Sequence, residues 1–197
     1  GNINLPQDKD MKLFDLPAEL LIDGPVEYDE DKKLTFKQVN ISDISFKQFE
    51  EFLNSLDEEK KTWSLDLQDF KNEKEFHNFF SSNKDTKFAG IVFLNENKII
   101  SLINVYIEPN QLYNVGVSFV VKKDYQGMGI GTRMLLEIER ILTESKWFVT
   151  NENQVPKMFG KHFKDNIASH KAFLKAGYEE AERALSEDEV IKYKVIK

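Results

Sequence analysis

The stretch "VGVSFVVKKDYQGMGIGTRMLLEIERIL" (residues 115–142) joins three kinds of sequence in a fixed order. An apolar run rich in valine ends at Val121, a polar turn with three glycines follows, and an amphipathic pattern begins directly after the glycines. This pattern predicts a strand, a tight turn and a helix over about 129–143. The apolar residues that share one face of this helix are Met134, Leu135, Ile138, Ile141 and Leu142.

The glycine turn suits an anion. A helix start leaves backbone N–H groups without intrahelical acceptors, the helix dipole adds positive potential there, and glycines let a bulky phosphate approach the backbone. The turn therefore predicts a phosphate-binding loop. Two common loops do not fit: the dinucleotide fingerprint G-x-G-x-x-G needs a third glycine where Thr132 stands, and the P-loop needs a Gly-Lys-Ser/Thr ending that is absent.

A third pattern fits both the turn and its surroundings. Gln126, Gly129 and Gly131 match Q/R-x-x-G-x-G, and "VVKKDYQGMGIGTRMLLEIE" resembles the central motif of the acetyl-CoA-dependent N-acetyltransferases of the GNAT superfamily. Downstream, "NIASHKAFLKAGY" (166–178) resembles that family's Asn-x-x-Ser/Ala…Gly-Phe/Tyr segment, whose helix lies beside the pantetheine arm. Two motifs in the family's order identify the chain as a relative of these enzymes.

The remaining elements agree with this resemblance from Lys33 to the C-terminus. Strands are predicted at 33–41, 86–94, 98–107, 113–121, 146–150, 178–182 and 189–196, and helices at 45–56, about 70–81, 129–143 and 167–176, with a long connection at 151–165. The order β-α-α-β-β-β-α-β-α-β-β predicts an α/β (α+β) protein with the GNAT fold. This fold has a central mixed, mostly antiparallel twisted sheet of about seven strands flanked by about four helices. We expect a GNAT domain over 33–197 and an N-terminal extension, or a small packed-on hairpin, over 1–32.

Composition narrows the function classes. The chain has 197 residues and a formal net charge of -7, which disfavours a nucleic-acid partner. It has no cysteine, which excludes disulfides, thiolate nucleophiles and cysteine metal sites. No apolar run approaches the roughly 20 residues that span a bilayer, so we expect a cytoplasmic protein without a membrane partner, as a monomer or homodimer. His77, His162 and His170 lack metal-ligand spacing, and we predict no metal site.

The resemblance implies where acetyl-CoA, the acetyl donor, would lie. Backbone N–H groups of residues 127–132 would hold its pyrophosphate, and the strand that ends at Val121 would lie beside the pantetheine arm, with the Phe119 backbone bonded to the acetyl carbonyl. Asn166 would contact pantetheine and also occupies a helix N-cap position. The implied cofactor-binding residues are Phe119, Val120, Val121, Gln126, Gly127, Met128, Gly129, Ile130, Gly131, Thr132, Asn166, Ser169 and Phe173.

The resemblance also implies direct transfer to an amine, which needs a base for the ammonium proton and an acid for the departing thiolate. Many relatives carry a carboxylate on the strand before the turn, but "YNVGVSFVV" has none, so the nearest candidates are Glu108 and Glu152, or a water chain. Phe173 stands at the position of the relatives' tyrosine acid, which leaves water, Tyr113 or Ser169 for that role.

The acceptor class stays open. The predicted loop 57–69 places Trp63 among carboxylates, which suits a cationic amine but also fits an ordinary solvated loop. A polyamine-like or antibiotic amine, an amino acid, and a protein N-terminus or lysine all remain. Two functions compete: an active N-acetyltransferase and a catalytically idle relative that binds acetyl-CoA or CoA as a sensor or interaction module.

Overall fold

The computed structural model describes residues 11–13, 15–29, 32–56, 70–81, 86–107, 114–145, 155–182 and 186–196. The strands are β1 (Met11–Leu13), β2 (Gly24–Asp29), β3 (Lys32–Asn40), β4 (Thr86–Asn95), β5 (Lys98–Ile107), β6 (Asn114–Val121), β7 (Lys157–Phe163), β8 (Glu179–Glu180) and β9 (Glu189–Val195). The α-helices of this described part are α1 (Phe46–Asn54), α3 (Glu73–Ser81), α4 (Ile130–Glu144) and α5 (Ile167–Lys175), and its 3₁₀ turns are η2 (Ala18–Leu20), η3 (Ile41–Asp43) and η5 (Lys123–Tyr125).

The described strands form one mixed sheet in the order β2-β3-β4-β5-β6-β7-β9-β8, with β1 added parallel to β4. All other pairs are antiparallel except β6 with β7. The predicted fold is confirmed: β3 to β9 supply the seven strands, four helices accompany them, and the element order agrees. The segment before residue 32 contributes the two further strands, and a domain boundary at that residue stays a prediction.

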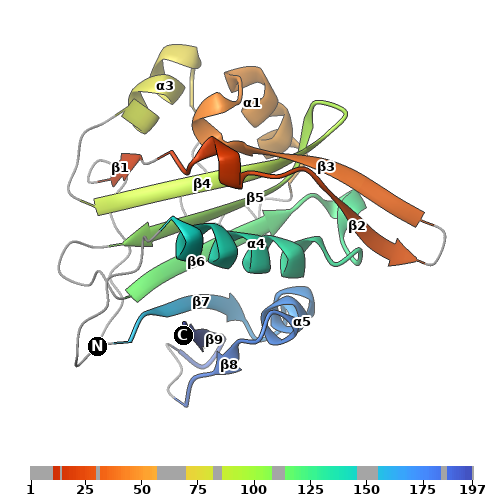
Figure 1. The fold of residues 1–197 in the computed structure, drawn as a ribbon, viewed down its shortest axis with the longest axis vertical. Helices are drawn as coiled ribbons and strands as arrows, with labels where there is room; N and C mark the ends of the chain where they lie inside the picture. The colour runs from red at the N-terminus through yellow and green to blue at the C-terminus, as the bar shows by residue number, and fades with distance from the viewer. Residues whose placement is uncertain are drawn as a thin grey trace.

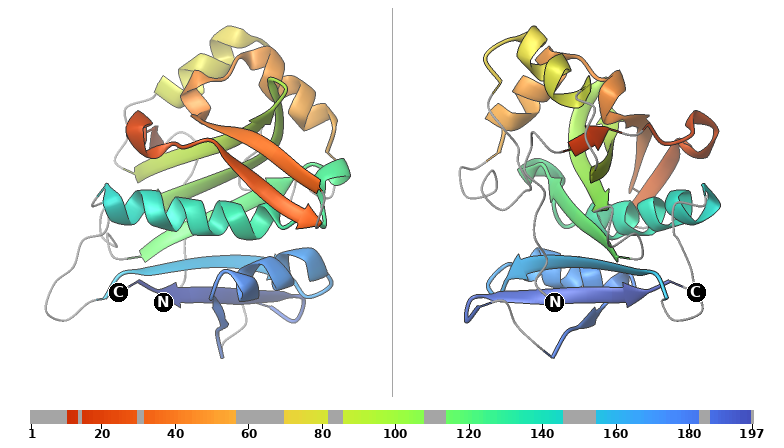
Figure 2. Two further views of the ribbon diagram at one scale, coloured as in Figure 1. Left: turned by 45° about the vertical axis from the view of Figure 1, so that its right-hand side comes forward. Right: turned by 90° about the vertical axis from the view of Figure 1, so that its left-hand side faces the viewer.

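Helices cover both faces of the sheet (Figures 1 and 2). α1 and α3 lie on one face over a core that includes Phe49, Phe52 and Phe76, and α4 and α5 lie on the other. The predicted apolar face of α4 is confirmed, since all five of its residues are fully buried. Burying one such side chain contributes roughly 1.5–3 kcal/mol, so α4 is held mainly by this face.

Local signals fix several element ends. Ser45 and Gln48 form the capping box at the start of α1, with N–H to side-chain oxygen distances of 3.1 and 2.9 Å. The β4–β5 hairpin turns at Glu96 and Asn97, whose φ angles of 52° and 65° suit the two-residue turns that join antiparallel strands.

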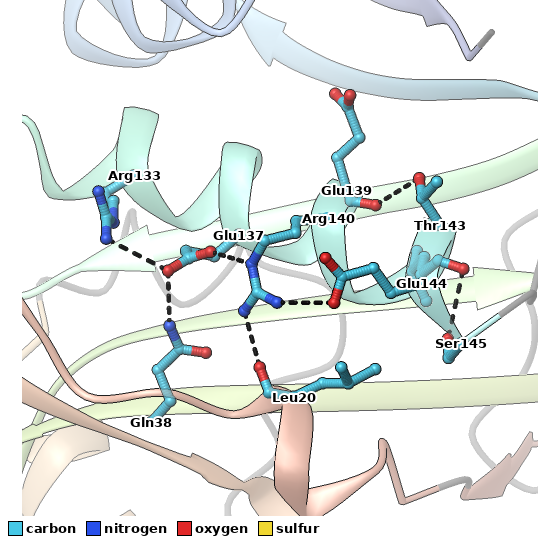
Figure 3. Close-up of polar contacts among 10 residues, drawn as sticks. Leu20, Gln38, Arg133, Glu137, Glu139, Arg140, Thr143, Glu144 and Ser145 are labelled. Carbon is cyan, nitrogen blue, oxygen red and sulfur yellow. Dashed lines mark hydrogen bonds and ion pairs between the residues drawn. The ribbon is translucent and has the colours of Figure 1, made fainter.

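A polar network joins α4 to the N-terminal part of the sheet (Figure 3). The buried Glu137 carboxylate accepts from Gln38 Nε2 of β3 at 3.1 Å and from Arg140 Nε at 2.8 Å, and Arg133 Nη2 lies 3.4 Å away. Arg140 Nη2 also donates to the Leu20 carbonyl oxygen at 2.7 Å. These contacts fix the position of α4, whose first residue follows the glycine turn.

The prediction of a long connection at 151–165 is wrong for residues 157–163. These residues form the strand β7, which pairs with both β6 and β9. The buried positions of this strand are Met158, Gly160 and His162. Glycine and histidine give no apolar alternation, so the period of two was hidden in the sequence. The predicted strand 146–150 lies outside the described residues, and so do Trp63 and the loop 57–69.

Candidate functional site

A cavity opens where β6 and β7 part. These parallel strands pair only from Asn114–Lys157 to Gly116–Phe159, and beyond that point they are no longer paired with each other. The cavity has a volume of about 510 Å³ and is lined by the second half of β6, the glycine turn, the start of α4, the end of β7 and α5. All of the predicted cofactor-binding residues except Met128 line it. Their contacts with a cofactor stay a prediction.

Two glycines shape the turn at one end of the cavity. Gly127 and Gly129 have φ angles of 79° and 78°, in the left-handed region that side chains avoid. A Cβ atom at either position would meet open space, so the backbone here is accessible to a ligand. Gly129 is the N-cap of α4, and the first intrahelical bond runs from Arg133 N to Gly129 O at 3.0 Å. The N–H groups before Arg133 therefore point out of the helix start without intrahelical acceptors.

Gly131 has a different role. A Cβ atom there would lie 2.9 Å from Phe119 of β6 and 3.3 Å from Cβ of Ala172 of α5. This glycine lets α4, α5 and β6 approach one another closely, which sets the width of the cavity beside the turn.

Side chains hold the turn against the sheet. Gln126 Nε2 donates to the carbonyl oxygen of Val121 at 3.3 Å, which ties the turn to the end of β6. Asn95 Nδ2 donates to the hydroxyl of Tyr125 at 3.2 Å, which ties it to the β4–β5 hairpin. Tyr125 lines the cavity and was missed by the sequence analysis, because its partner lies 30 residues earlier.

α5 forms one wall of the cavity, and both of its ends are capped. The Asn166 side chain accepts a hydrogen bond from Ser169 N at 3.1 Å. This confirms the helix cap, which is one of the two roles predicted for Asn166. At the other end, Gly177 has φ of 91°, its N–H donates to the Leu174 carbonyl oxygen, and Tyr178 N–H donates to that of Phe173. These two hydrogen bonds form a Schellman motif. The ring centroids of Phe173 and Tyr178, the residues at its two ends, lie 5.0 Å apart.

Phe173 is buried against the strands that part. A Cβ atom at Gly160 of β7 would lie 2.6 Å from the Phe173 ring, so the glycine makes room for the ring. Phe119 packs on the same ring edge-on at 5.4 Å. The side chain that occupies the relatives' tyrosine position is therefore a hydrocarbon wall of the cavity, and it carries no proton to transfer.

His162 of β7 lies next to Phe173, with nearly parallel rings 6.0 Å apart. Lys192 Nζ of β9, fully buried, lies 2.9 Å from His162 Nε2 and donates to Glu180 Oε1 at 2.8 Å. The His162 Nδ1 atom lies 2.7 Å from the Phe163 carbonyl oxygen. Burial lowers the pKa of His162, and the Lys192 hydrogen bond lowers the pKa of the Glu180 carboxyl. The ring is therefore a neutral acceptor for Lys192.

The charged residues of the cavity wall come from β7, α5, β9 and the turn between β7 and α5. Lys161, Lys171 and Lys175 line it together with Asp165 and Glu189, and Lys161 Nζ lies 3.9 Å from Glu189. The sequence alone did not single out these three lysines, because β7 and α5 bring them to the cavity. Arg133, four residues after the N-cap of α4, does not line the cavity and instead lies beside Glu137.

The three candidate catalytic residues Glu108, Tyr113 and Glu152 lie outside the described residues. Within the part of the chain that is described, no group of three or more histidine or acidic side chains is placed to hold a metal ion. None of the helices described there is long and apolar enough to cross a membrane.

Several solved structures share this fold. The GNAT domain of S. lividans PAT matches with a TM-score of 0.66 and 17% identity, over 91% of this chain and 99% of that chain. Campylobacter jejuni N-acetyltransferase PseH, in complex with acetyl coenzyme A, matches with a TM-score of 0.56 and 14% identity, over 82% and 99%. A domain from Methanocaldococcus jannaschii matches with a TM-score of 0.56 and 16% identity, over 82% and 99%. At such identities the likeness shows the fold alone.

Comparison with curated proteins gave no match. A sequence model of the acetyltransferase (GNAT) family matches residues 49–178, which is more than half of the chain and includes the glycine turn, the parted strands and α5. The chain therefore belongs to the GNAT family of acetyltransferases.

Proposed function

We propose that this chain is an N-acetyltransferase that binds acetyl-CoA between β6 and β7 and transfers the acetyl group directly to a primary amine of a small molecule or peptide. The observation that carries this proposal is the cavity, which runs from the parted strands to the open backbone at the start of α4. A long ligand with a thioester at one end and a pyrophosphate in the middle has the shape and charge that this cavity suits.

In this proposal the pyrophosphate accepts hydrogen bonds from the backbone N–H groups of residues 127–132. The pantetheine arm lies along β6 next to Asn166 and Ser169, and the backbone N–H of Phe119 faces the acetyl carbonyl. Lys161, Lys171 and Lys175 give the cavity wall cationic groups that favour an anionic ligand.

Direct transfer agrees with the composition, because a chain without cysteine cannot form a thioester intermediate of its own. The free amine attacks the acetyl carbonyl carbon, the C–N bond forms as the C–S bond breaks, and CoA leaves as a thiol. Glu108, Glu152 or a water chain remain proposals for the base that takes the ammonium proton. The proposed acceptor is an amine that is cationic in water, and its identity within that class is open.

A second function is favoured by a specific observation. Phe173 has no proton to give and β6 has no carboxylate, so the chain lacks the two groups that the resemblance leads us to expect. A catalytically idle protein that binds acetyl-CoA or CoA as a sensor or interaction module would keep the glycine turn and lose those groups.

One experiment separates the two. Calorimetric titration with acetyl-CoA measures binding, and a thiol-release assay measures CoA formed with spermidine, L-lysine, an aminoglycoside and a lysine-containing peptide as acceptors. We expect micromolar binding and CoA release that depends on one class of acceptor. Binding without release from any acceptor would favour the idle module, and absence of binding would contradict both functions.

A further inference from the structure

Lys161 of β7 lies at the gap between the parted strands. The last pair of β6 and β7 is Gly116 with Phe159, and two residues further along each strand Lys161 stands across the gap from Ser118. Both residues line the cavity, and so does Phe119, the next residue of β6. A primary amine of the chain itself is thus carried by the part of β7 that borders the position proposed for the acetyl group.

The side chain of Lys161 points to the face of the sheet opposite α5. Successive side chains of a strand alternate between the two faces. Gly160 and His162 face α5, because each lies against the Phe173 ring. Lys161 stands between them and therefore faces the other way, where its partner Glu189 of β9 also lines the cavity. The cavity thus reaches through the gap from one face of the sheet to the other.

The Lys161 amine is held loosely in this position. Its Nζ atom lies 3.9 Å from Glu189 Oε2, and 43% of its side chain is exposed. Exposed ion pairs contribute little to stability, and a lysine carries its amine on a flexible four-carbon stem. The amine can therefore leave Glu189 and turn into the gap.

The other two lysines of the cavity lie at its opposite end. Lys171 and Lys175 are four residues apart on α5 and so share one face of that helix. Ala172 lies between them, and its Cβ atom is 3.3 Å from a Cβ atom built on Gly131 at the start of α4. These two lysines therefore lie beside the turn proposed for the pyrophosphate, whereas Lys161 lies beside the proposed thioester.

We propose that Lys161 is a site of self-acetylation, at which the acetyl-CoA bound by a chain modifies a lysine of that same chain. This inference rests on the proposed function, because it needs acetyl-CoA in this cavity. The Lys161 ammonium first releases one proton to water. The free amine attacks the acetyl carbonyl carbon, and the C–N bond forms as the C–S bond breaks. The nitrogen loses a second proton and the CoA sulfur gains one, so the products are N-acetyl-lysine, a CoA thiol and one released proton.

Mass spectrometry of the full chain, incubated with acetyl-CoA and no added amine, tests this inference. We expect a mass gain of about 42 Da, one acetyl group in place of one hydrogen. Peptide sequencing is expected to place it on Lys161. Lys157 is the internal control, because it is exposed on the same face of β7 and does not line the cavity. We expect Lys161 to be acetylated at least ~10²-fold faster than Lys157, since bound acetyl-CoA is held beside it.

Two variants and a dilution series complete the test. Lys161→Arg keeps the positive charge but removes the reactive amine, and it is expected to lose the mass gain. Lys157→Arg is the matched variant and is expected to keep the gain. The rate constant per chain is expected to stay the same when the protein is diluted tenfold, as for a reaction within one chain.

The possible results separate this inference from the proposed function. Equal rates at Lys157 and Lys161 would mean ordinary chemical acetylation of exposed lysines and would overturn the inference. A rate that rises in proportion to protein concentration would also overturn it, because one chain would then modify another. Unmodified Lys161 in a protein that acetylates an added amine would overturn the inference and leave the proposed function standing. Absence of acetyl-CoA binding would overturn both.

Discussion

At the scale of single residues, the environment of His162 makes the protein sensitive to pH. Its Nε2 accepts from the buried Lys192 ammonium, which only the neutral ring permits, and His170 and Glu180 are the other titratable groups beside it. Burial lowers the pKa of His162 below its ordinary 6.5. As the pH falls through 6.5, His162 binds a proton in the unfolded chain but stays neutral in the folded chain. The free energy of unfolding therefore decreases from pH 7 towards pH 5.

Urea denaturation at pH 5, 6 and 7 checks this prediction. His162→Gln keeps a neutral acceptor near Lys192 and is expected to flatten the pH dependence. The exposed His77, replaced by glutamine, serves as the control and is expected to leave the slope as in wild type. The pKa of the Glu180 carboxyl is lowered, so this group titrates below the window. Equal slopes in wild type and His162→Gln would contradict the prediction.

At the scale of elements, two glycines with the same backbone conformation are expected to behave differently. Gly129 begins α4 with φ of 78°, and Gly177 ends α5 with φ of 91°. Alanine at either position meets the cost of a left-handed conformation, about 1–2 kcal/mol of stability. Gly129→Ala additionally places a methyl group in the turn that lines the cavity, and we expect acetyl-CoA to bind about tenfold more weakly, equivalent to about 1.4 kcal/mol.

Urea denaturation and calorimetric titration of both variants measure the two effects. Gly177→Ala is the matched control, since it is expected to lose similar stability and to keep the wild-type affinity. If both variants lost affinity equally, the loss would come from a loosened fold rather than from the turn.

The elements also show what a sequence can predict. The capping box at Ser45, the hairpin turn at Glu96 and the Schellman glycine at 177 are each encoded by residues that lie within a few positions of one another. β7 was missed because two of its three buried positions are Gly160 and His162, whose burial depends on Phe173 and Lys192 from other elements.

The candidate site divides in the same way. The glycine turn is local, and its motif was sufficient to place it beside a cavity. The wall opposite the turn is not local, because His162 and Lys161 reach the cavity only through the register of β7. Which residues of β7 face the cavity depends on how the strands pair in the sheet, and this register cannot be predicted from one sequence.

At the scale of the whole molecule, Arg140 joins parts of the chain that lie far apart. It donates to Leu20, 120 residues away, and to Glu137, which in turn accepts from Gln38, 99 residues away (Figure 3). The network thus ties the N-terminal segment and β3 to the helix that begins at the glycine turn. If this segment folds with the rest of the sheet, the loss of Arg140 should weaken the whole molecule and not α4 alone.

We expect Arg140→Ala to lower the free energy of unfolding by about 2 kcal/mol, because the buried Glu137 loses a charge-assisted hydrogen bond and keeps Gln38 and Arg133 as partners. Glu144→Gln is the control: it removes an exposed ion pair with the same arginine, with an expected cost below about 0.5 kcal/mol. Urea denaturation measures both values, and hydrogen exchange measures where protection is lost. Faster exchange in β2 and β3 of Arg140→Ala, as well as in α4, is the expected result. Loss of protection confined to α4 would instead mean that the N-terminal segment folds independently, as a separate extension would.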